Sequence, residues 1–256
     1  MENKFAIFLD IDGTIYDEGK VNKEDLDAIK KAREQGHKVF INTGRTYAII
    51  PEKVKNLEVD GIVAGIGTHI LYEGKALRSV ILPKDLLKKC VKHALDENLK
   101  IELQGEVEDL YINCGSCPER TVTDAEEITG KFKDFRIAKF VIFGQFSDKD
   151  RKFLETDFDV FQYATYGEVA PKGYTKAEGI KFIEEYFGIL HKNTIAMGDS
   201  ANDLDMVEYA AIGVAMGNGE ESLKLAANYV TAPINEAGVA KAIEKFVFSG
   251  EGKSAC

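Results

Sequence analysis

Two aspartates, one residue apart, end the first apolar stretch of the chain. Residues 5–9 are apolar, and Asp10-Ile11-Asp12-Gly13 follows them directly. This pattern predicts a buried strand, with both carboxylates projecting from its carboxyl end on the same side of the extended chain. Crowded negative charge is costly unless a cation or a shared proton relieves it. The pair indicates a metal site, although an Asp-rich exit from a strand into a turn fits the same residues.

A second apolar run ends in residues that suit phosphate. Residues 38–42 lead into Thr43-Gly44-Arg45. The Thr43 hydroxyl and the backbone N–H groups that follow it, beginning with that of Gly44, can hold a phosphate oxygen. Taken alone, the same three residues also fit a turn from a strand into a helix.

A third apolar run, residues 193–197, leads into Gly-Asp-Ser-Ala-Asn-Asp at residues 198–203. The carboxyl ends of parallel strands meet at one edge of a sheet, so folding would gather the three polar groups there. Three carboxylates around one point favour a hard divalent cation, and Mg²⁺ takes carboxylate, water and phosphate oxygens. Lys176, at the start of a predicted helix, offers a positive charge for a phosphate or for the attacking carboxylate. The other residues expected to converge are Asp10, Asp12, Thr43, Asp199, Asn202 and Asp203.

The elements that position these residues predict a parallel sheet. Residues 22–35 begin like a capping box, continue with apolar residues at helical spacing and stop at Gly36. A strand, this helix and the strand at residues 38–42 make a right-handed βαβ unit. The same alternation resumes after Pro171, with a helix at residues 176–187 and further strands. We therefore predict an α/β fold.

Between these two parts the pattern changes. From Pro83 to Glu168, helices alternate with strands in which apolar and polar residues alternate, as expected of an antiparallel sheet with one wet face. We predict that residues 83–168 form an α+β domain inserted into a core domain of residues 1–82 and 169–256. Such a domain can exclude water from a site at the sheet edge, with the two crossings as hinges.

The composition is that of an ordinary globular protein. The chain has 33 Lys and Arg against 43 Asp and Glu, for a formal net charge of −10. No dense basic block offsets this balance, which argues against nucleic acid or an anionic membrane as a partner. No apolar stretch approaches the roughly 20 residues that span a bilayer, and the N-terminus lacks the order of a signal peptide. We expect a cytoplasmic protein, either a monomer or a weak homodimer.

The cysteines suggest little chemistry. Cys114 and Cys117 form a CxxC, which could be a redox pair or half of a zinc site. Only Cys90 and Cys256 remain, and no histidine stands at metal-ligand spacing. We expect reduced, structurally ordinary thiols.

These motifs resemble those of the haloacid-dehalogenase-like (HAD) superfamily, and within it the Cof-type phosphatases with the larger α/β (type IIB) cap. The resemblance is carried by residues 10–14, 43–45, 171–176 and 198–203, in matching order and spacing across the whole chain. Each motif is weak alone, but four in series around an inserted domain are specific. The resemblance implies a Rossmann-like parallel-sheet core with an inserted α+β cap domain.

The resemblance also implies a role for each site residue. Asp10 would attack phosphorus and form an aspartyl-phosphate, and Asp12 would act first as an acid and then as a base. Mg²⁺ would be held by Asp10, by the backbone carbonyl of Asp12 and by Asp199, with Asp203 orienting the surroundings of the metal. The phosphoryl oxygens would be held by Thr43, Gly44, Lys176 and Asn202.

The chain departs from the family's pattern at one place and is ambiguous at another. Family members commonly have Asn-Gly-Ala after the third strand, whereas this chain has Ile66-Gly67-Thr68. No role of that Asn is carried over to Ile66. The third motif contains both Lys172 and Lys176. The register of the match favours Lys176, and Lys172 is expected to be a solvated neighbour.

The implied function is a Mg²⁺-dependent phosphomonoesterase for small phosphorylated metabolites, sugar phosphates first. Asp12 favours hydrolysis or transfer to an alcohol, because a dehalogenase needs no acid or base at that position. A phosphomutase uses the same pair and stays open, as do a catalytically idle sensor of a phosphorylated ligand and a purely structural role of the carboxylates in turns and caps. Polar and aromatic residues of the insert suit a polyhydroxylated ligand: Glu102, Gln104, Tyr111, Asn113 and Arg120.

Overall fold

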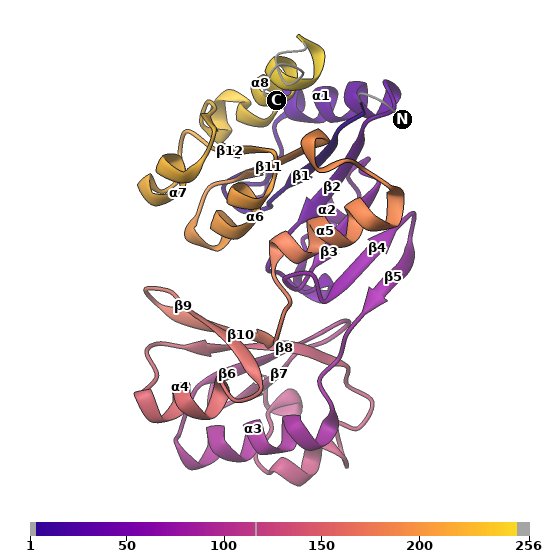
Figure 1. Ribbon diagram of the computed structural model, residues 1–256. Coiled ribbons are helices and arrows are strands. Elements are labelled where there is room, and N and C mark those ends of the chain that lie inside the picture. Colours follow the sequence, from indigo (N-terminus) through magenta and orange to yellow (C-terminus); the bar gives the residue numbers. More distant parts are fainter. Residues whose placement is uncertain (1–3, 116, 250–256) are drawn as a thin grey trace. The chain divides into compact units, whose positions relative to one another are not determined.

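The computed structural model describes residues 4–115 and 117–249, which form two compact units (Figure 1). The first unit comprises residues 4–44, 50–78 and 175–249, and the second comprises the rest. The chain thus crosses between the units at Arg78/Ser79 and Tyr174/Thr175, whereas the predicted boundaries were 82/83 and 168/169. The second crossing is later because the last strand of the second unit continues to Pro171. No pattern in the sequence indicates that residues 45–49 belong to the second unit.

The first unit contains an eight-stranded sheet in the order β13-β12-β11-β1-β2-β3-β4-β5. The apolar strand β1 lies inside it and pairs in parallel with β2 on one side and β11 on the other. Only β4 and β5 run as an edge hairpin, with β4 antiparallel to β3. The predicted parallel sheet is therefore confirmed. The strands are β1 (Ala6–Leu9), β2 (Lys38–Asn42), β3 (Gly61–Ala64), β4 (His69–Tyr72), β5 (Lys75–Ser79), β11 (Thr194–Gly198), β12 (Ile212–Ala215) and β13 (Tyr229–Val230).

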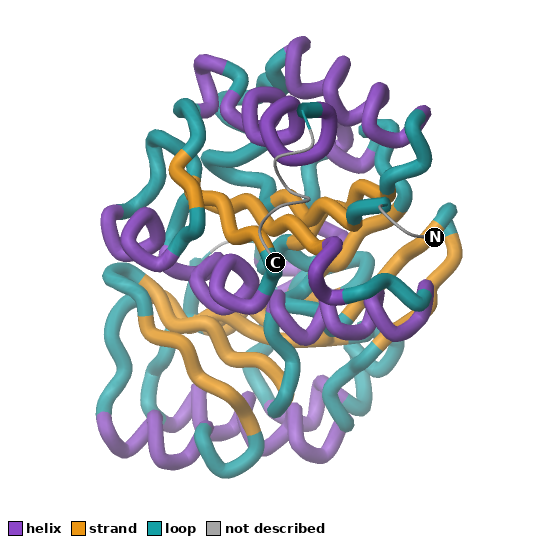
Figure 2. The backbone as a smooth tube through the Cα atoms, turned by 45° about the horizontal axis from the view of Figure 1, so that its top comes forward, coloured by secondary structure: helices purple, strands orange, loops and turns teal. Residues whose placement is uncertain are grey.

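Helices cover both faces of this sheet (Figure 2). Ala6 and Phe8 of β1 pack in one apolar cluster with Ile180 of α5 and Val207 of α6. Ile7 alternates with them along the strand and so faces the other side, where α1 and α8 pack against each other. None of the described helices is long and apolar enough to cross a membrane. The helices are α1 (Lys23–Glu34), α2 (Glu52–Lys55), α5 (Lys176–Phe187), α6 (Leu204–Tyr209), α7 (Glu221–Ala226) and α8 (Gly238–Ile243), with short turns of helix at His191–Asn193, Ala201–Asp203, Ile234–Glu236 and Glu244–Phe248.

The second unit is built on a five-stranded antiparallel sheet in the order β7-β6-β8-β10-β9. One face carries the apolar core of the unit, in which Leu103 and Phe140 pack with Val91 of α3 and Leu154 of α4. This is the α+β arrangement that the alternating pattern predicts. The elements are α3 (Lys84–Asp96), β6 (Ile101–Gly105), β7 (Leu110–Ile112), β8 (Ile137–Phe143), α4 (Asp148–Leu154), β9 (Phe158–Gln162) and β10 (Tyr166–Pro171), with 3₁₀ turns at Tyr47–Ile49, Pro118–Arg120 and Ala125–Ile128.

The opposite face of the second sheet is polar. The strand register places Glu102 beside Tyr111 and Gln104 beside Lys139. Lys139 is buried and forms an ion pair with Glu168 of β10. Ionisable side chains on this face alternate with the apolar residues of the core face, as the period of a strand requires.

Candidate active site

Asp10 is fixed at the carboxyl edge of the first sheet. Its backbone N–H continues the ladder beyond β1 and donates to the Met197 carbonyl at 3.0 Å. Its side chain is buried, whereas the Asp12 side chain is exposed. Gly13 turns the chain with a φ of +72°, and a Cβ there would collide with the Asp199 carboxylate. Glycine thus allows the segment after β1 to pack directly on the segment after β11.

Lys176 joins two carboxylates from different elements. Its Nζ donates to Asp10 Oδ1 at 2.7 Å and forms a second, shorter ion pair with Asp203. Lys176 Nζ also lies 3.4 Å from Asn202 Oδ1. Lys176 is the first residue of α5, and the Thr175 side chain caps that helix by accepting from the Glu178 N–H at 3.2 Å. The start of the helix therefore fixes the position of the Lys176 ammonium group.

Asp203 organises the loop after β11. Its Oδ2 accepts from the backbone N–H groups of Asp199 at 2.9 Å and Ser200 at 3.1 Å. Gly198 makes room for it, since a Cβ at Gly198 would collide with the Asp203 side chain. Ser200 Oγ donates to Asn202 Oδ1 at 2.9 Å, which orients the amide next to Lys176. The loop is thus held by one buried carboxylate.

The carboxylates of Asp10, Asp199 and Asp203 form a cluster in which one oxygen from each lies within 4.8 Å of the others. Burial, followed by the charge of Asp203, raises the pKa of Asp10 to about 7. The same two causes raise the pKa of Asp199 to about 7. Burial alone would lower the pKa of Lys176, but Asp10 and Asp203 raise it further, so the net shift is upward and the lysine is charged.

These residues fit a divalent metal ion. The donor set consists of carboxylate oxygens, which hard cations prefer. Asp199 Oδ1 is buried and has no hydrogen-bond partner, so it offers an unsatisfied ligand atom. Ionised, the three acids and Lys176 together leave two negative charges to be compensated. The cluster contains Asp10 and Asp199, two of the expected metal ligands, together with Asp203, which was expected beside the metal; the Asp12 side chain is exposed, and its expected ligand atom is the backbone carbonyl.

Thr43 directly follows β2 at the same sheet edge and is buried. Its N–H donates to the Val63 carbonyl at 2.9 Å, and its carbonyl accepts from the Ile66 N–H at 3.2 Å. Gly44 follows as the last residue of this stretch of the first unit. The two residues expected to hold phosphate therefore follow the strand next to β1.

The loop that contains Ile66 adopts an unusual backbone conformation. Gly65, Ile66 and Gly67 have φ values of +58°, +56° and +82°. A β-branched residue rarely adopts this left-handed conformation, so Ile66 is strained. A Cβ at Gly67 would lie 2.9 Å from the Thr175 carbonyl, which brings this loop against the start of α5. The position where the chain departs from the family's pattern thus adjoins both Thr43 and α5.

Two residues at this edge were not predicted. Asn42 is fully buried, and its Nδ2 donates to the backbone carbonyl of Lys176 at 3.0 Å. The available signal for it was a polar residue at the end of an apolar strand. Asn218 donates to the Gly13 carbonyl at 2.8 Å and accepts from the Ile234 N–H at 2.8 Å, so it ties the turn after β1 to a distant loop. Its sequence neighbourhood, Gly-Asn-Gly, indicates only a turn.

Other candidate residues lie elsewhere. Lys172 belongs to the second unit, where its Nζ donates to the Thr156 carbonyl at 2.9 Å, so Lys176 alone of the two lysines contacts Asp10. Cys114 Sγ donates to backbone carbonyls, and Arg120 Nε donates to Cys117 Sγ at 3.1 Å. Within the described parts of the chain, no metal-ligand cluster includes a cysteine.

Comparison with known proteins agrees with this geometry. Residues 7–243 match the model of a family described as haloacid dehalogenase-like hydrolase. The chain is 32% identical to the 5-amino-6-(5-phospho-D-ribitylamino)uracil phosphatase YcsE of Bacillus subtilis, with 94% of this chain and 95% of that one covered. It is 30% identical to a phosphoglycolate phosphatase of Methanosarcina acetivorans, with 93% and 95% covered.

A solved structure shows the same fold. The HAD subclass IIB sugar phosphatase BT4131 matches with a TM-score of 0.79 and 29% identity, over 95% of this chain and 99% of that one. The family match, the relatives and the shared fold lead to one conclusion: the chain belongs to the haloacid dehalogenase-like hydrolases and is a phosphatase of the Cof type.

Proposed function

We propose that the protein is a Mg²⁺-dependent phosphomonoesterase that hydrolyses small phosphorylated metabolites, sugar phosphates first, through an aspartyl-phosphate on Asp10. The observation that supports it most is the buried Asp10 carboxylate, held by Lys176 at the sheet edge beside Asp199. The relatives support the same substrate class: YcsE is a phosphatase of 5-amino-6-(5-phospho-D-ribitylamino)uracil, the Methanosarcina relative is a phosphatase of phosphoglycolate, and BT4131 is a sugar phosphatase. We place this activity in the cytoplasm, in a monomer or weak homodimer.

In the first half-reaction an Asp10 carboxylate oxygen attacks phosphorus while the bond from phosphorus to the leaving oxygen breaks. Lys176 donates to Asp10 Oδ1, which fixes the rotamer of the nucleophile. Asp12, which lies two residues after Asp10 and is exposed, gives a proton to the leaving alkoxide. The products are an alcohol and an aspartyl-phosphate.

In the second half-reaction water attacks the same phosphorus. Asp12, now ionised, takes a proton from that water, and the bond between Asp10 and phosphorus breaks. Inorganic phosphate leaves and Asp10 is regenerated. The Thr43 hydroxyl, the backbone N–H of Gly44, Lys176 and Asn202 hold the phosphoryl oxygens in both steps.

Asp10, the backbone carbonyl of Asp12 and Asp199 would hold Mg²⁺, with Asp203 fixing the loop that carries Asp199. When bound, the ion neutralises charge on the carboxylates and on the phosphoryl oxygens. Two observations support this assignment. Asp199 Oδ1 has no hydrogen-bond partner, and Lys176 compensates only one of the three negative charges that the ionised acids of the cluster carry.

The second unit, in this proposal, is the cap that selects the leaving group. Its polar sheet face presents Glu102, Gln104 and Tyr111, and Arg120 lies over the Tyr111 ring at 5.9 Å. Gln104 Oε1 is buried without a hydrogen-bond partner. Acceptors and aromatic rings of this kind suit a polyhydroxylated ligand.

The test is a phosphate-release assay over a broad panel of phosphorylated metabolites with Mg²⁺, comparing the wild type with Asp10→Asn. We expect release of free phosphate from several sugar phosphates and its loss in the variant, which should still bind ligand. Conversion to an isomer without free phosphate would identify a phosphomutase instead. Ligand binding without turnover in the wild type would identify an idle sensor.

A further inference from the structure

The loop that follows β12 contacts two of the segments that carry candidate active-site residues. Residues 216–220 form this loop, and β12 itself pairs with β11 and not with β1. Asn218 Nδ2 donates to the Gly13 carbonyl at 2.8 Å, and the Glu220 N–H donates to the Asp199 carbonyl at 2.7 Å. The loop thus reaches past β11 and joins the segment after β1 to the segment after β11.

The Asn218 side chain uses both ends of its amide. Nδ2 donates to the Gly13 carbonyl, and Oδ1 accepts from the Ile234 N–H at 2.8 Å. A carbonyl needs a donor and an N–H needs an acceptor, so these two partners determine which end of the amide faces Gly13. Although the residue is exposed, its side chain is therefore held in one orientation.

The hydrogen bond to Gly13 acts on the turn that carries Asp12. On one side of Asp12, the buried Ile11 is anchored, because its carbonyl accepts from the Tyr16 N–H at 2.9 Å. On the other side, the Gly13 N–H donates to the Tyr16 carbonyl at 3.2 Å and the Gly13 carbonyl accepts from Asn218. The exposed Asp12 side chain depends on this backbone for its position.

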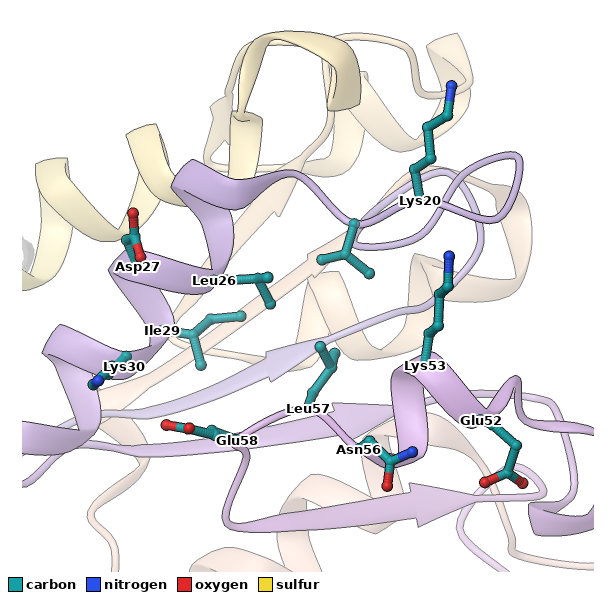
Figure 3. Close-up of a pocket in the computed structure, with 11 residues that line it drawn as sticks. Lys20, Leu26, Asp27, Ile29, Lys30, Glu52, Lys53, Asn56, Leu57 and Glu58 are labelled. Atoms are coloured by element: carbon teal, nitrogen blue, oxygen red, sulfur yellow. The ribbon is translucent and has the colours of Figure 1, made fainter.

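The segment that follows the turn borders a groove on the side of α1 and α2. The groove has a volume of about 780 Å³, and Lys20 lines it together with Leu26 of α1 (Figure 3). Lys53 Nζ of α2 donates to the Gly19 carbonyl at 2.7 Å. Because side chains do not fill the groove, packing does not press the segment onto the sheet from that side. Hydrogen bonds such as the one from Asn218 therefore matter more for the position of the turn.

We propose that Asn218 is a positioning residue for Asp12, which it holds where the carboxyl group can reach the leaving oxygen. This inference rests on the proposed function, in which Asp12 gives a proton to that oxygen. Asn218 acts through the Gly13 carbonyl and not on the substrate. A displacement of about 1 Å can lower the rate of a reaction about a hundredfold, so a small shift of the turn is enough to matter.

Two aryl phosphates separate this role from a purely structural one. Phenolate is the stronger base and leaves faster when it is protonated, whereas p-nitrophenolate is a weak base that leaves without a proton. The ratio kcat/KM reports the transfer of the phosphoryl group to Asp10, the step in which the leaving oxygen needs the acid. We expect Asn218→Ala to lower kcat/KM about tenfold for phenyl phosphate and less than about twofold for p-nitrophenyl phosphate. The quotient of the two values does not depend on how much of the variant is folded.

Two further variants sharpen the test. Asn218→Asp still accepts from the Ile234 N–H, but its carboxylate cannot donate to the Gly13 carbonyl. Its added charge acts on both phosphates alike, so the quotient should fall as it does in Asn218→Ala. Asn228→Ala is the matched control, because Asn228 Oδ1 accepts from the Gly213 N–H of β12 at 2.6 Å. This control should lose stability and keep the quotient of the wild type.

The outcomes distinguish this inference from the proposed function. If the wild type hydrolyses both phosphates and the quotient is unchanged in both Asn218 variants, Asn218 does not position Asp12. The same conclusion follows if Asn228→Ala lowers the quotient as much as Asn218→Ala does. If the wild type releases phosphate from neither compound, the proposed function is wrong and this inference is overturned with it.

Discussion

Asp199 is the acid of the cluster whose hydrogen bonding is left incomplete. Its Oδ1 is buried without a partner, and its pKa is raised to about 7, chiefly by burial and next by Asp203. A cation that binds the folded chain satisfies this oxygen and stabilises the fold by mass action. Mg²⁺ should therefore raise the melting temperature of the wild type.

Asp199→Asn should remove most of that stabilisation, because the amide cannot replace the charge of the carboxylate. The measurement is the melting temperature against Mg²⁺ concentration for both proteins. Glu208→Gln provides a matched control on the neighbouring helix α6, at an exposed position outside the cluster. Equal shifts in the wild type and in Asp199→Asn would place the metal elsewhere.

Asn42 binds the main chain of Lys176, so it can affect the reaction only by positioning that lysine. The hydrogen bond from Asn42 Nδ2 to the Lys176 carbonyl measures 3.0 Å and is fully buried. Asn42→Ala removes this hydrogen bond to the start of α5 and so loosens the position of Lys176, which should lower kcat about tenfold with little change in KM. Asn42→Gln, which keeps the amide but lengthens the side chain, should not restore kcat, whereas Asn42→Ser should restore part of it. A fall in stability with unchanged kcat in Asn42→Ala would mean that the residue is only structural.

The contrast between Asp10 and Asn42 shows what could be predicted at this scale. Asp10, Thr43 and Asp199 each follow an apolar run, and the topology of a parallel sheet brings such positions together. Asn42 binds a carbonyl 134 residues further along the chain. No local pattern encodes that contact, since it depends on how α5 packs on β2.

At the scale of elements, α1 and α8 are joined by a buried acid. Asp25 of α1 is fully buried and accepts from the Ala240 N–H of α8 at 2.7 Å. Burial raises its pKa from 3.8 to about 6, against the lowering effect of the Ala240 N–H. The folded protein therefore binds this proton more tightly than the unfolded chain does.

It follows that ionisation of Asp25 destabilises the fold as pH rises from about 4 to about 6. Asp25→Asn lacks this ionisation, so its free energy of unfolding relative to the wild type should rise by about 3 kcal/mol across that window and stay level above it. Denaturant unfolding at a series of pH values measures the difference. Asp27→Asn, an exposed site on the same helix, should show no such change. A difference that is flat with pH in Asp25→Asn would contradict the assignment.

The helices and strands were predicted to different degrees. The apolar runs that became β1, β2 and β11 were clear because parallel strands are buried on both faces. The loop at Ile66 was not predictable, because a β-branched residue with a φ of +56° contradicts local preference. Only the packing of Gly67 against the start of α5 explains why the chain turns there.

At the scale of the whole molecule, the division into two units was predictable from the change in hydrophobic pattern, but its boundaries were not. They follow strand pairing to within a few residues: β5 of the first sheet ends at Ser79, directly at the first crossing, and β10 of the second sheet runs to Pro171, shortly before the second crossing. Residues 45–49 belong to the second unit through packing alone. The proposed role of the second unit as a cap can be tested with substitutions on the polar face of its sheet.

Variants on the polar face of the second sheet should change which substrates are preferred. Glu102→Gln and Arg120→Ala should each alter the ranking of sugar phosphates by kcat/KM about tenfold or more, because a lost polar contact is poorly replaced. The rate with an aryl phosphate, whose leaving group needs no such contact, should stay close to that of the wild type. Glu97→Gln, which removes an ion pair with Lys149 beyond the end of α3, serves as the control. An unchanged ranking in all three variants would locate selectivity in the first unit.

The crossing at Tyr174/Thr175 has a consequence for how the chain can diverge. Thr175 is the first residue of the first unit after the crossing and also the N-cap of α5, and Lys176 follows it immediately. An insertion or deletion between the end of β10 and Thr175 would therefore act one residue away from the lysine that holds Asp10. The other crossing, after β5, is followed by four residues without helix or strand before α3 begins at Lys84 and could absorb such changes in length. Insertions and deletions in the inserted domain are thus expected to accumulate at the first crossing, after β5, and not at the second crossing, before α5.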